Sequence, residues 1–167
     1  MQERKTTEPE LDSSADDPRL ARAARSMAFL ARIFEQVSLD AGISLPQYRL
    51  LVFLRHGPKR AGELAARAAI KRPTLTALVD ALEKEQRLQR VADERDGRGV
   101  RIEMTEKGHS DLRGVEEALA SVVKEVCVLG EYEETLSTID RLSERLDVEF
   151  EKRMKESQGR WFGQGVD

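Results

Sequence analysis

The sequence predicts a mainly α-helical chain with one small β-hairpin. Apolar residues recur at steps of three and four along segments near both ends, the spacing of a helix with one buried face. Val100, Ile102 and Met104 instead alternate with charged residues, which is the period of a strand with one buried face. Gly97 and Gly99 precede this strand and supply the backbone freedom that a tight turn needs. The 167 residues are enough to bury a core.

The N-terminal region divides into a tail and a helix. Residues 1–17 are polar and acidic and have no apolar periodicity, so we expect a disordered tail there. A helix is expected over about residues 18–40, and Ala41-Gly42 ends it. Its apolar stripe consists of Leu20, Ala24, Met27, Ala31 and Phe34.

Three further helices are expected before the hairpin. Ser44 and Gln47 fit a capping box at the start of a helix of about 12 residues that runs to His56-Gly57-Pro58. A short helix over residues 61–68 is expected to direct Leu64 and Ala65 inward. After a brief turn, Pro73 opens a helix to about residue 85, with proline in the first turn.

This last helix has two unlike faces. The inward face is expected to hold Leu75, Leu78, Val79 and Leu82, and the other face Pro73, Thr76, Ala77, Asp80 and Lys84. Two short helices with a tight connection, the second with small and hydroxyl side chains at its start, are typical of a helix-turn-helix. The alternative is a plain pair of surface helices, although threonine and proline are poor helix formers for a surface without a partner.

The hairpin carries arginines at its tip. Leu88 and Val91 begin the first strand, and Arg95 and Arg98 lie beyond it in a compact cationic turn with Asp93 and Asp96. Such a turn suits a phosphate backbone or a narrow minor groove. An ordinary solvated hairpin with paired charges is the alternative.

Two long helices are expected after the hairpin, the first capped by Thr105 and ended by Gly130. Their apolar stripes are Leu112, Val115, Leu119, Val122, Val126 and Leu129, then Tyr132, Leu136, Ile139, Leu146 and Phe150. These stripes exceed what a winged helix of about 60 residues covers, so we expect homodimerisation through them. The resulting regions are a tail at 1–17, an N-terminal dimerisation helix at 18–43, a winged helix-turn-helix at 44–104, C-terminal dimerisation helices at 105–156, and a tail at 157–167.

Charge is distributed unevenly along the chain. The net charge is −3, but residues 46–107 carry 14 Lys or Arg against 9 Asp or Glu, a net charge of +5. The remainder carries 14 against 22, a net charge of −8. A basic middle with acidic flanks is what local DNA binding requires.

Several classes of protein are disfavoured by the same composition. Neither a membrane span nor the apolar stretch of a secretory signal is seen, so a cytoplasmic protein is expected. A glycine-rich phosphate loop and telling carboxylate pairs are also lacking, which argues against an enzyme and a cofactor. Cys127 is the single cysteine, and we expect it to be packed in the interior. Together with His56 and His109 it makes no convincing zinc site, so no metal is expected.

With these features in place, the chain resembles the MarR (multiple-antibiotic-resistance regulator) family of winged helix-turn-helix proteins over about residues 18–153. The most specific motif is Asp93-x-Arg95-Asp96-x-Arg98, followed by Met104-Thr105-x-x-Gly108. Supporting motifs are Leu45-x-Gln47-Tyr48-x-x-Leu51, Glu63-Leu64-Ala65 and Leu78-Val79-Asp80-x-Leu82-Glu83.

The chain departs from this family at three positions. Gln86 stands where the family usually has glycine, so the helix cap there is strained or differently shaped. Arg87 puts a charge where an apolar residue is usual, unless it projects outward toward phosphate. Arg60 stands where a Ser or Thr cap is common, which leaves the capping of that helix open.

The resemblance implies a dimeric, ligand-responsive transcriptional regulator, most often a repressor, on a pseudo-palindromic site in double-stranded DNA. The helix from Pro73 would enter the major groove with Thr74, Thr76 and Ala77 near the bases. Lys71 and Arg72 would contact phosphate, Arg95 and Arg98 the backbone or minor groove, and Asp93 and Asp96 would hold the wing in shape. The alternatives are an interaction module of the same fold that has lost DNA binding, and a redox sensor that uses Cys127.

The resemblance further implies a small-molecule effector between the dimer helices and the winged domain. Candidate pocket residues are Arg25, Met27, Phe29, Tyr48, Arg49, Phe53 and His56. For each of them, an ordinary core or surface role remains the alternative.

Overall fold

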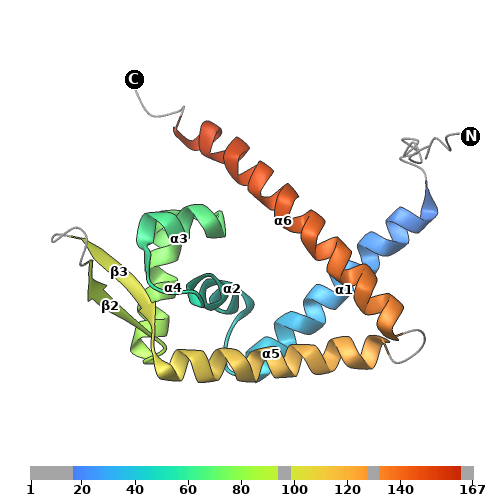
Figure 1. Ribbon diagram of the computed structural model, residues 1–167, viewed down its shortest axis with the longest axis horizontal. Coiled ribbons are helices and arrows are strands. Elements are labelled where there is room, and N and C mark those ends of the chain that lie inside the picture. Colours follow the sequence, from blue (N-terminus) through green and yellow to red (C-terminus); the bar gives the residue numbers. More distant parts are fainter. Residues whose placement is uncertain (1–16, 94–98, 128–131, 163–167) are drawn as a thin grey trace, which may run out of the picture. The chain divides into compact units, whose positions relative to one another are not determined.

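The computed structural model describes residues 17–93, 99–127 and 132–162. In these ranges it has helices α1 (Pro18–Asp40), α2 (Leu45–Leu54), α3 (Ala61–Ala68), α4 (Arg72–Lys84), α5 (Glu106–Cys127) and α6 (Tyr132–Phe162), and strands β1 (Lys59–Arg60), β2 (Leu88–Ala92) and β3 (Val100–Met104) (Figure 1). The predicted class, mainly α-helical with a small β-hairpin wing, is confirmed.

The chain forms two compact units, one up to Ile33 and one from Phe34 onward. The boundary lies within α1, whose last residues belong to the second unit. In the first unit the predicted apolar stripe is open to solvent, since Leu20 is 63% and Met27 54% exposed. The predicted tail at 1–17 lies outside the described residues except for Asp17.

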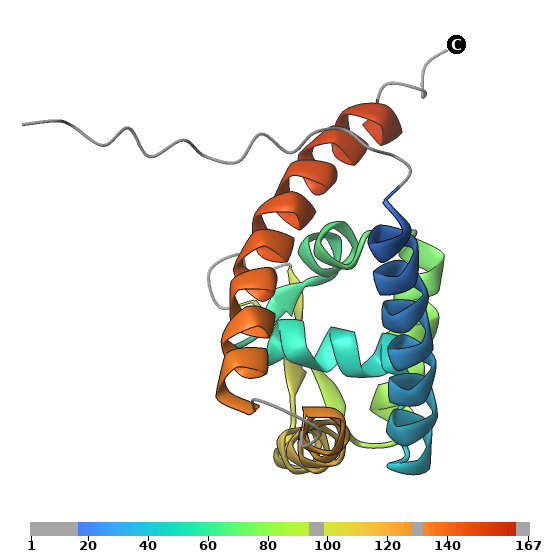
Figure 2. The same cartoon turned by 90° about the vertical axis from the view of Figure 1, so that its right-hand side faces the viewer.

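The second unit contains the winged helix-turn-helix. α2, α3 and α4 contact one another, and α2 also packs across α5, as both views show (Figure 1 and Figure 2). The strands form an antiparallel sheet in the order β1-β3-β2, with Leu88 opposite Met104 and Ala92 opposite Val100. In β1, Lys59 pairs with Ile102. This strand was not predicted, because two residues are too short for any period to show.

The helix signals of the sequence act as expected at α2. The Ser44 hydroxyl accepts from the Gln47 amide N–H, and the Gln47 side chain accepts from the Ser44 N–H at 2.9 Å, which confirms the capping box. The helix ends at Leu54, shortly before the predicted stop at Gly57.

The core lies where the inward faces of the helix-turn-helix, the hairpin and α5 meet. Leu64 of α3 and Leu82 of α4 are fully buried, as predicted. The fifteen buried apolar residues of this cluster are Ile43, Leu50, Leu51, Leu54, Leu64, Ala65, Leu75, Val79, Leu82, Leu88, Ile102, Met104, Leu112, Val115 and Leu119. Because every described element from α2 to α5 except β1 contributes to it, α4 is anchored in the same core as the hairpin.

Two apolar positions differ from expectation. Val100, expected on the buried face of its strand, is 56% exposed because it lies at the last pair of the hairpin, opposite Ala92. Val126, expected on the inward stripe of α5, is also 56% exposed, because Cys127 takes the buried position in the last turn. Cys127 itself is 4% exposed, in agreement with the expected interior packing.

The C-terminal helix is longer than predicted. α6 runs to Phe162, whereas a tail was expected from residue 157. Trp161 and Phe162, placed by the sequence in that tail, are therefore helical. No helix among the described residues is both long and apolar enough to cross a membrane.

Candidate nucleic-acid interface

The connection between α3 and α4 is tight because α3 ends in a left-handed residue. Ala69 has φ 52°, its N–H donates to the carbonyl of Ala66, and the Ile70 N–H donates to the carbonyl of Ala65. These two bonds form a Schellman motif, which reverses the chain direction at once. Lys71 then serves as the N-cap residue of α4 without a side-chain capping bond.

The N-terminal turns of α4 form an exposed surface over an anchored underside. Leu75, Val79 and Leu82 are each at most 2% exposed, which fixes the helix to the core. All six residues of the helix-turn-helix that were predicted to contact DNA are exposed: Lys71, Arg72, Pro73, Thr74, Thr76 and Ala77. The structure therefore brings these residues together on one exposed surface, with two cationic side chains at its start.

Thr76 has a defined hydrogen-bonding state on this surface. Its hydroxyl donates to the Arg72 carbonyl at 3.0 Å, one turn back in the same helix. The hydroxyl proton is thereby used, and the oxygen lone pairs and the methyl group remain for a partner.

The base of the wing is held by a buried carboxylate. Asp93 is 3% exposed, its side chain accepts from Arg60 Nε at 2.8 Å, and its N–H donates to the Gly99 carbonyl at 2.8 Å. Arg60 is the N-cap residue of α3 and makes no side-chain capping bond. The first turn of α3 therefore lacks the side-chain hydrogen bond that a Ser or Thr N-cap would supply. Its guanidinium instead ties the start of α3 to the wing. Arg95, Asp96 and Arg98 lie outside the described residues.

Arg90 makes a second connection between the hairpin and α4. From β2 its guanidinium pairs with Asp80 at 2.5 Å and with Glu83, both on α4. The hydrogen bond from Arg90 to Asp80 also raises the pKa of Arg90. Arg60 and Arg90 were not predicted as site residues, because their roles depend on carboxylates that the fold brings close.

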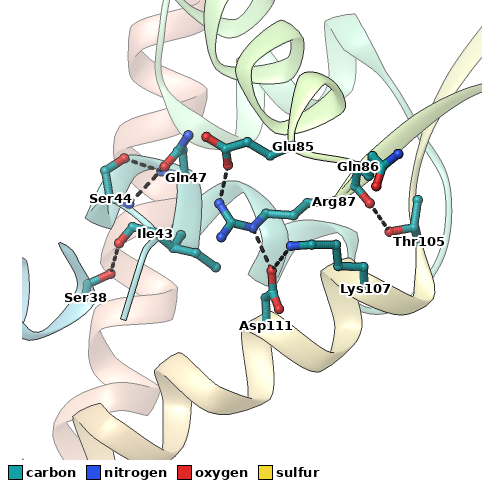
Figure 3. Close-up of polar contacts among 10 residues, drawn as sticks. All are labelled: Ser38, Ile43, Ser44, Gln47, Glu85, Gln86, Arg87, Thr105, Lys107 and Asp111. Carbon is teal, nitrogen blue, oxygen red and sulfur yellow. Dashed lines mark hydrogen bonds and ion pairs between the residues drawn. The ribbon is translucent and has the colours of Figure 1, made fainter. Parts of the chain in front are cut away.

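Gln86 and Arg87, the two residues that depart from the usual family pattern, lie at the junction of α4, β2 and α5 (Figure 3). Gln86 has φ 60°, and the Gln86 and Arg87 N–H groups donate to the Glu83 and Leu82 carbonyls. This is again a Schellman motif, so the cap keeps its usual shape and places a non-glycine residue in the left-handed region.

The Arg87 side chain does not project toward phosphate. It is 11% exposed, its Nε donates to Asp111 Oδ2 on α5 at 2.8 Å, and its Nη1 pairs with Glu85 (Figure 3). Lys107 pairs with the same carboxylate from one turn earlier in α5. Burial raises the pKa of Asp111, but the hydrogen bonds from Lys107 and Arg87 together hold this pKa below its usual value.

The candidate effector-pocket residues fall in both compact units. Arg25, Met27 and Phe29 lie in the first unit and are exposed. In the second unit, Tyr48 and Phe53 are partly buried against the core, and Arg67 lies over the Phe53 ring at 5.7 Å. Arg49 and His56 are exposed. The pocket itself stays a prediction.

The long helices present apolar side chains to solvent in the single chain. Exposed large apolar residues on α1, α5 and α6 are Leu20, Met27, Phe29, Leu39, Val126, Tyr132, Ile139, Leu142, Leu146, Val148 and Phe150.

Among the described residues no group of three or more His, Cys, Asp or Glu could hold a metal ion.

Comparison with known proteins finds a similarity over part of the chain. Residues 41–99 match the model of the MarR family. The HTH-type transcriptional regulator YfiV of Bacillus subtilis (strain 168) is 32% identical over 91 residues, which cover 54% of this chain and 56% of that protein. The chain thus matches little more than half the length of this curated relative.

Solved structures share the fold over most of the chain. The transcriptional repressor CouR, bound to a 23-mer DNA duplex, has a TM-score of 0.63 at 20% identity and covers 75% of this chain and 89% of its own. NadR in complex with 4-hydroxyphenylacetate has a TM-score of 0.59 at 24% identity, with coverage of 78% and 94%. The chain is therefore similar to the MarR family over residues 41–99, and it shares the fold of these two solved structures over 75% and 78% of its length.

Proposed function

We propose that this protein is a dimeric, ligand-responsive transcriptional repressor that binds a pseudo-palindromic site in double-stranded DNA. The observation that carries the proposal is the surface at the start of α4, where six residues suited to DNA are exposed above a fully buried underside. A helix anchored in this way can enter the major groove without loss of core packing. CouR, which has the same fold, is a repressor bound to DNA.

The reading contacts follow from the chemistry of these side chains. Lys71 and Arg72 approach phosphates at the groove edge, at the N-terminus of α4, where the helix dipole favours an anion. Because the Thr76 hydroxyl already donates to Arg72, its oxygen accepts from an amino group of adenine or cytosine, or its methyl packs on thymine. Thr74 and Ala77 are small enough to allow close approach to the bases.

The wing adds contacts to the backbone or the adjacent minor groove through Arg95 and Arg98. Support comes from its base, where Asp93 and Arg60 tie the hairpin to the start of α3. Replacing both wing arginines by Ala should weaken operator binding and flatten the dependence of log K on log salt by about two, at one phosphate contact per wing. Unchanged affinity and slope would remove the wing from the interface.

Dimerisation would bury the exposed apolar side chains of the long helices. Val148 is 71% and Leu146 56% exposed in the single chain, and the gathering of exposed apolar side chains along one helix favours an interface. The effector would bind beside these helices, as a small molecule related in kind to the 4-hydroxyphenylacetate of NadR, with the candidate pocket residues as its lining.

The proposal is tested by selecting duplexes from a random pool with the full chain, followed by gel shifts with the DNA upstream of its own gene. The expected result is enrichment of a palindrome with half-sites about one helical turn apart. Enrichment of no sequence would favour the alternative of an interaction module without DNA binding. Oxidation is then applied to wild type and to a Cys127→Ser variant. If oxidation abolishes DNA binding equally in both proteins, Cys127 is not the sensor and the redox-sensor alternative is excluded at this cysteine.

A further inference from the structure

The corner between α4 and β2 rests directly on the start of α5. The Thr105 N–H donates to the Arg87 carbonyl at 3.1 Å. The Thr105 hydroxyl donates to the Gln86 carbonyl at 2.7 Å (Figure 3). The next turn of α5 lies equally close, because a Cβ on Gly108 would be 2.2 Å from the Arg87 carbonyl oxygen. Backbone atoms of the reading helix's cap and of α5 thus meet without intervening side chains.

The Arg87 guanidinium adds a charged link across this contact. Its Nε binds Asp111 on α5, while its Nη1 pairs with Glu85 at the end of α4. Its Nη2 lies 3.6 Å from where a Cβ on Gly42 would be, so the side chain also touches the turn between α1 and α2. One planar group therefore contacts three elements, and its fork geometry defines their mutual angle more sharply than apolar packing would.

We propose that Arg87 is a positioning residue for DNA recognition. Through Asp111 it fixes the orientation of α4 relative to α5, and in the dimer this orientation sets the spacing between the two reading helices. The inference rests on the proposed function, because spacing has meaning only for a dimer that reads two half-sites.

The structure offers a variant that removes this link with little other damage. Arg87→Leu puts an apolar side chain in a nearly buried position, and Asp111 retains Lys107 as an ion-pair partner. An unpaired buried carboxylate is the usual cause of large destabilisation, and this variant leaves none. Lys107→Ala is the matched control, because it removes the other cation from Asp111 but leaves the connection between α4 and α5 intact.

The experiment repeats the random-duplex selection with wild type, Arg87→Leu, Arg87→Lys and Lys107→Ala. Affinities are then measured for the selected duplex and for duplexes with one or two base pairs inserted or removed between the half-sites. We expect wild type and Lys107→Ala to prefer one spacing by about tenfold or more. Arg87→Leu should accept neighbouring spacings within about threefold, and Arg87→Lys should recover part of the preference because it keeps the cation.

Circular dichroism and thermal unfolding establish that each variant is folded. Should Arg87→Leu fail to fold, Asp111→Asn takes its place, since it removes the charge and keeps the shape of the side chain. A folded variant with the same sharp spacing preference as wild type overturns the inference and leaves the proposed function standing. Enrichment of no paired half-sites by wild type overturns both.

Discussion

Gly108 and Gly114 lie on the same helix, and the same substitution should have opposite effects at the two positions. A Cβ at Gly108 would lie 2.2 Å from the Arg87 carbonyl oxygen and 2.6 Å from Met104 Cγ. The carbonyl belongs to the backbone, so α5 and the α4–β2 corner would have to separate. At Gly114, by contrast, no atom of the described residues outside the local helix lies within 4 Å of the added Cβ.

The expected magnitudes follow from these surroundings. Gly114→Ala should raise the free energy of unfolding by up to about 1 kcal/mol, the difference in helix propensity. Gly108→Ala gains the same propensity but incurs the overpacking cost of about 1–3 kcal/mol or more, and it weakens the Thr105 bond to Arg87, worth about 1 kcal/mol. The net result should be a loss of about 1–3 kcal/mol.

The assay is urea unfolding of wild type and both variants, monitored by circular dichroism at one fixed protein concentration, because the proposed dimer would make stability depend on concentration. Equal stability of Gly108→Ala and Gly114→Ala would refute the close contact between α5 and the α4–β2 corner. A stabilised Gly108→Ala variant would refute it more strongly.

Three other predictions concern the junction of α4, β2 and α5 and the base of the wing. Gln86→Gly should stabilise the protein by about 0.5–1 kcal/mol, because φ 60° is strained for Gln and free for Gly; a lower midpoint in urea would contradict this. The pKa of Asp111 is lower in the folded protein than the unfolded value of about 4. The Asp111 carboxylate therefore stabilises the folded state above about pH 4, and this stabilisation is lost as the pH falls through the folded-state pKa. The stability difference between wild type and Asp111→Asn should therefore shrink below about pH 4, and a difference independent of pH would rule out this linkage. Arg60→Ala should cost about 1–2 kcal/mol and speed hydrogen exchange at the Asp93 amide; unaltered exchange there would mean that Arg60 does not hold the wing.

Elements with long periodic patterns or explicit caps were predictable from the sequence. The capping box at Ser44 and the buried face of Leu75, Val79 and Leu82 were anticipated because they depend on residues three or four apart. The exposure of the reading surface follows from the same period, since a helix with one buried face exposes the other.

Features that depend on contacts between distant segments were missed. The link between Arg60 and Asp93 joins residues that are 33 positions apart, and that between Arg87 and Asp111 joins residues 24 apart, so no local pattern shows them. For Arg87 the expected alternative to apolar packing was a contact with phosphate, whereas the fold supplies Asp111 instead. The exposed Val100 shows that alternation gives the face of a strand but not how far the core extends along it.

The claim that this chain reads DNA sequence through the start of α4 is tested most directly by comparing two duplexes. Wild type and a Thr74→Ala/Thr76→Ala variant are titrated, by fluorescence anisotropy at one salt concentration, against the selected duplex and a scrambled one. We predict that the variant binds the selected duplex at least about tenfold more weakly, since each base contact contributes about 1–3 kcal/mol, and binds the scrambled duplex as wild type does. An unchanged ratio between the two duplexes would contradict the account.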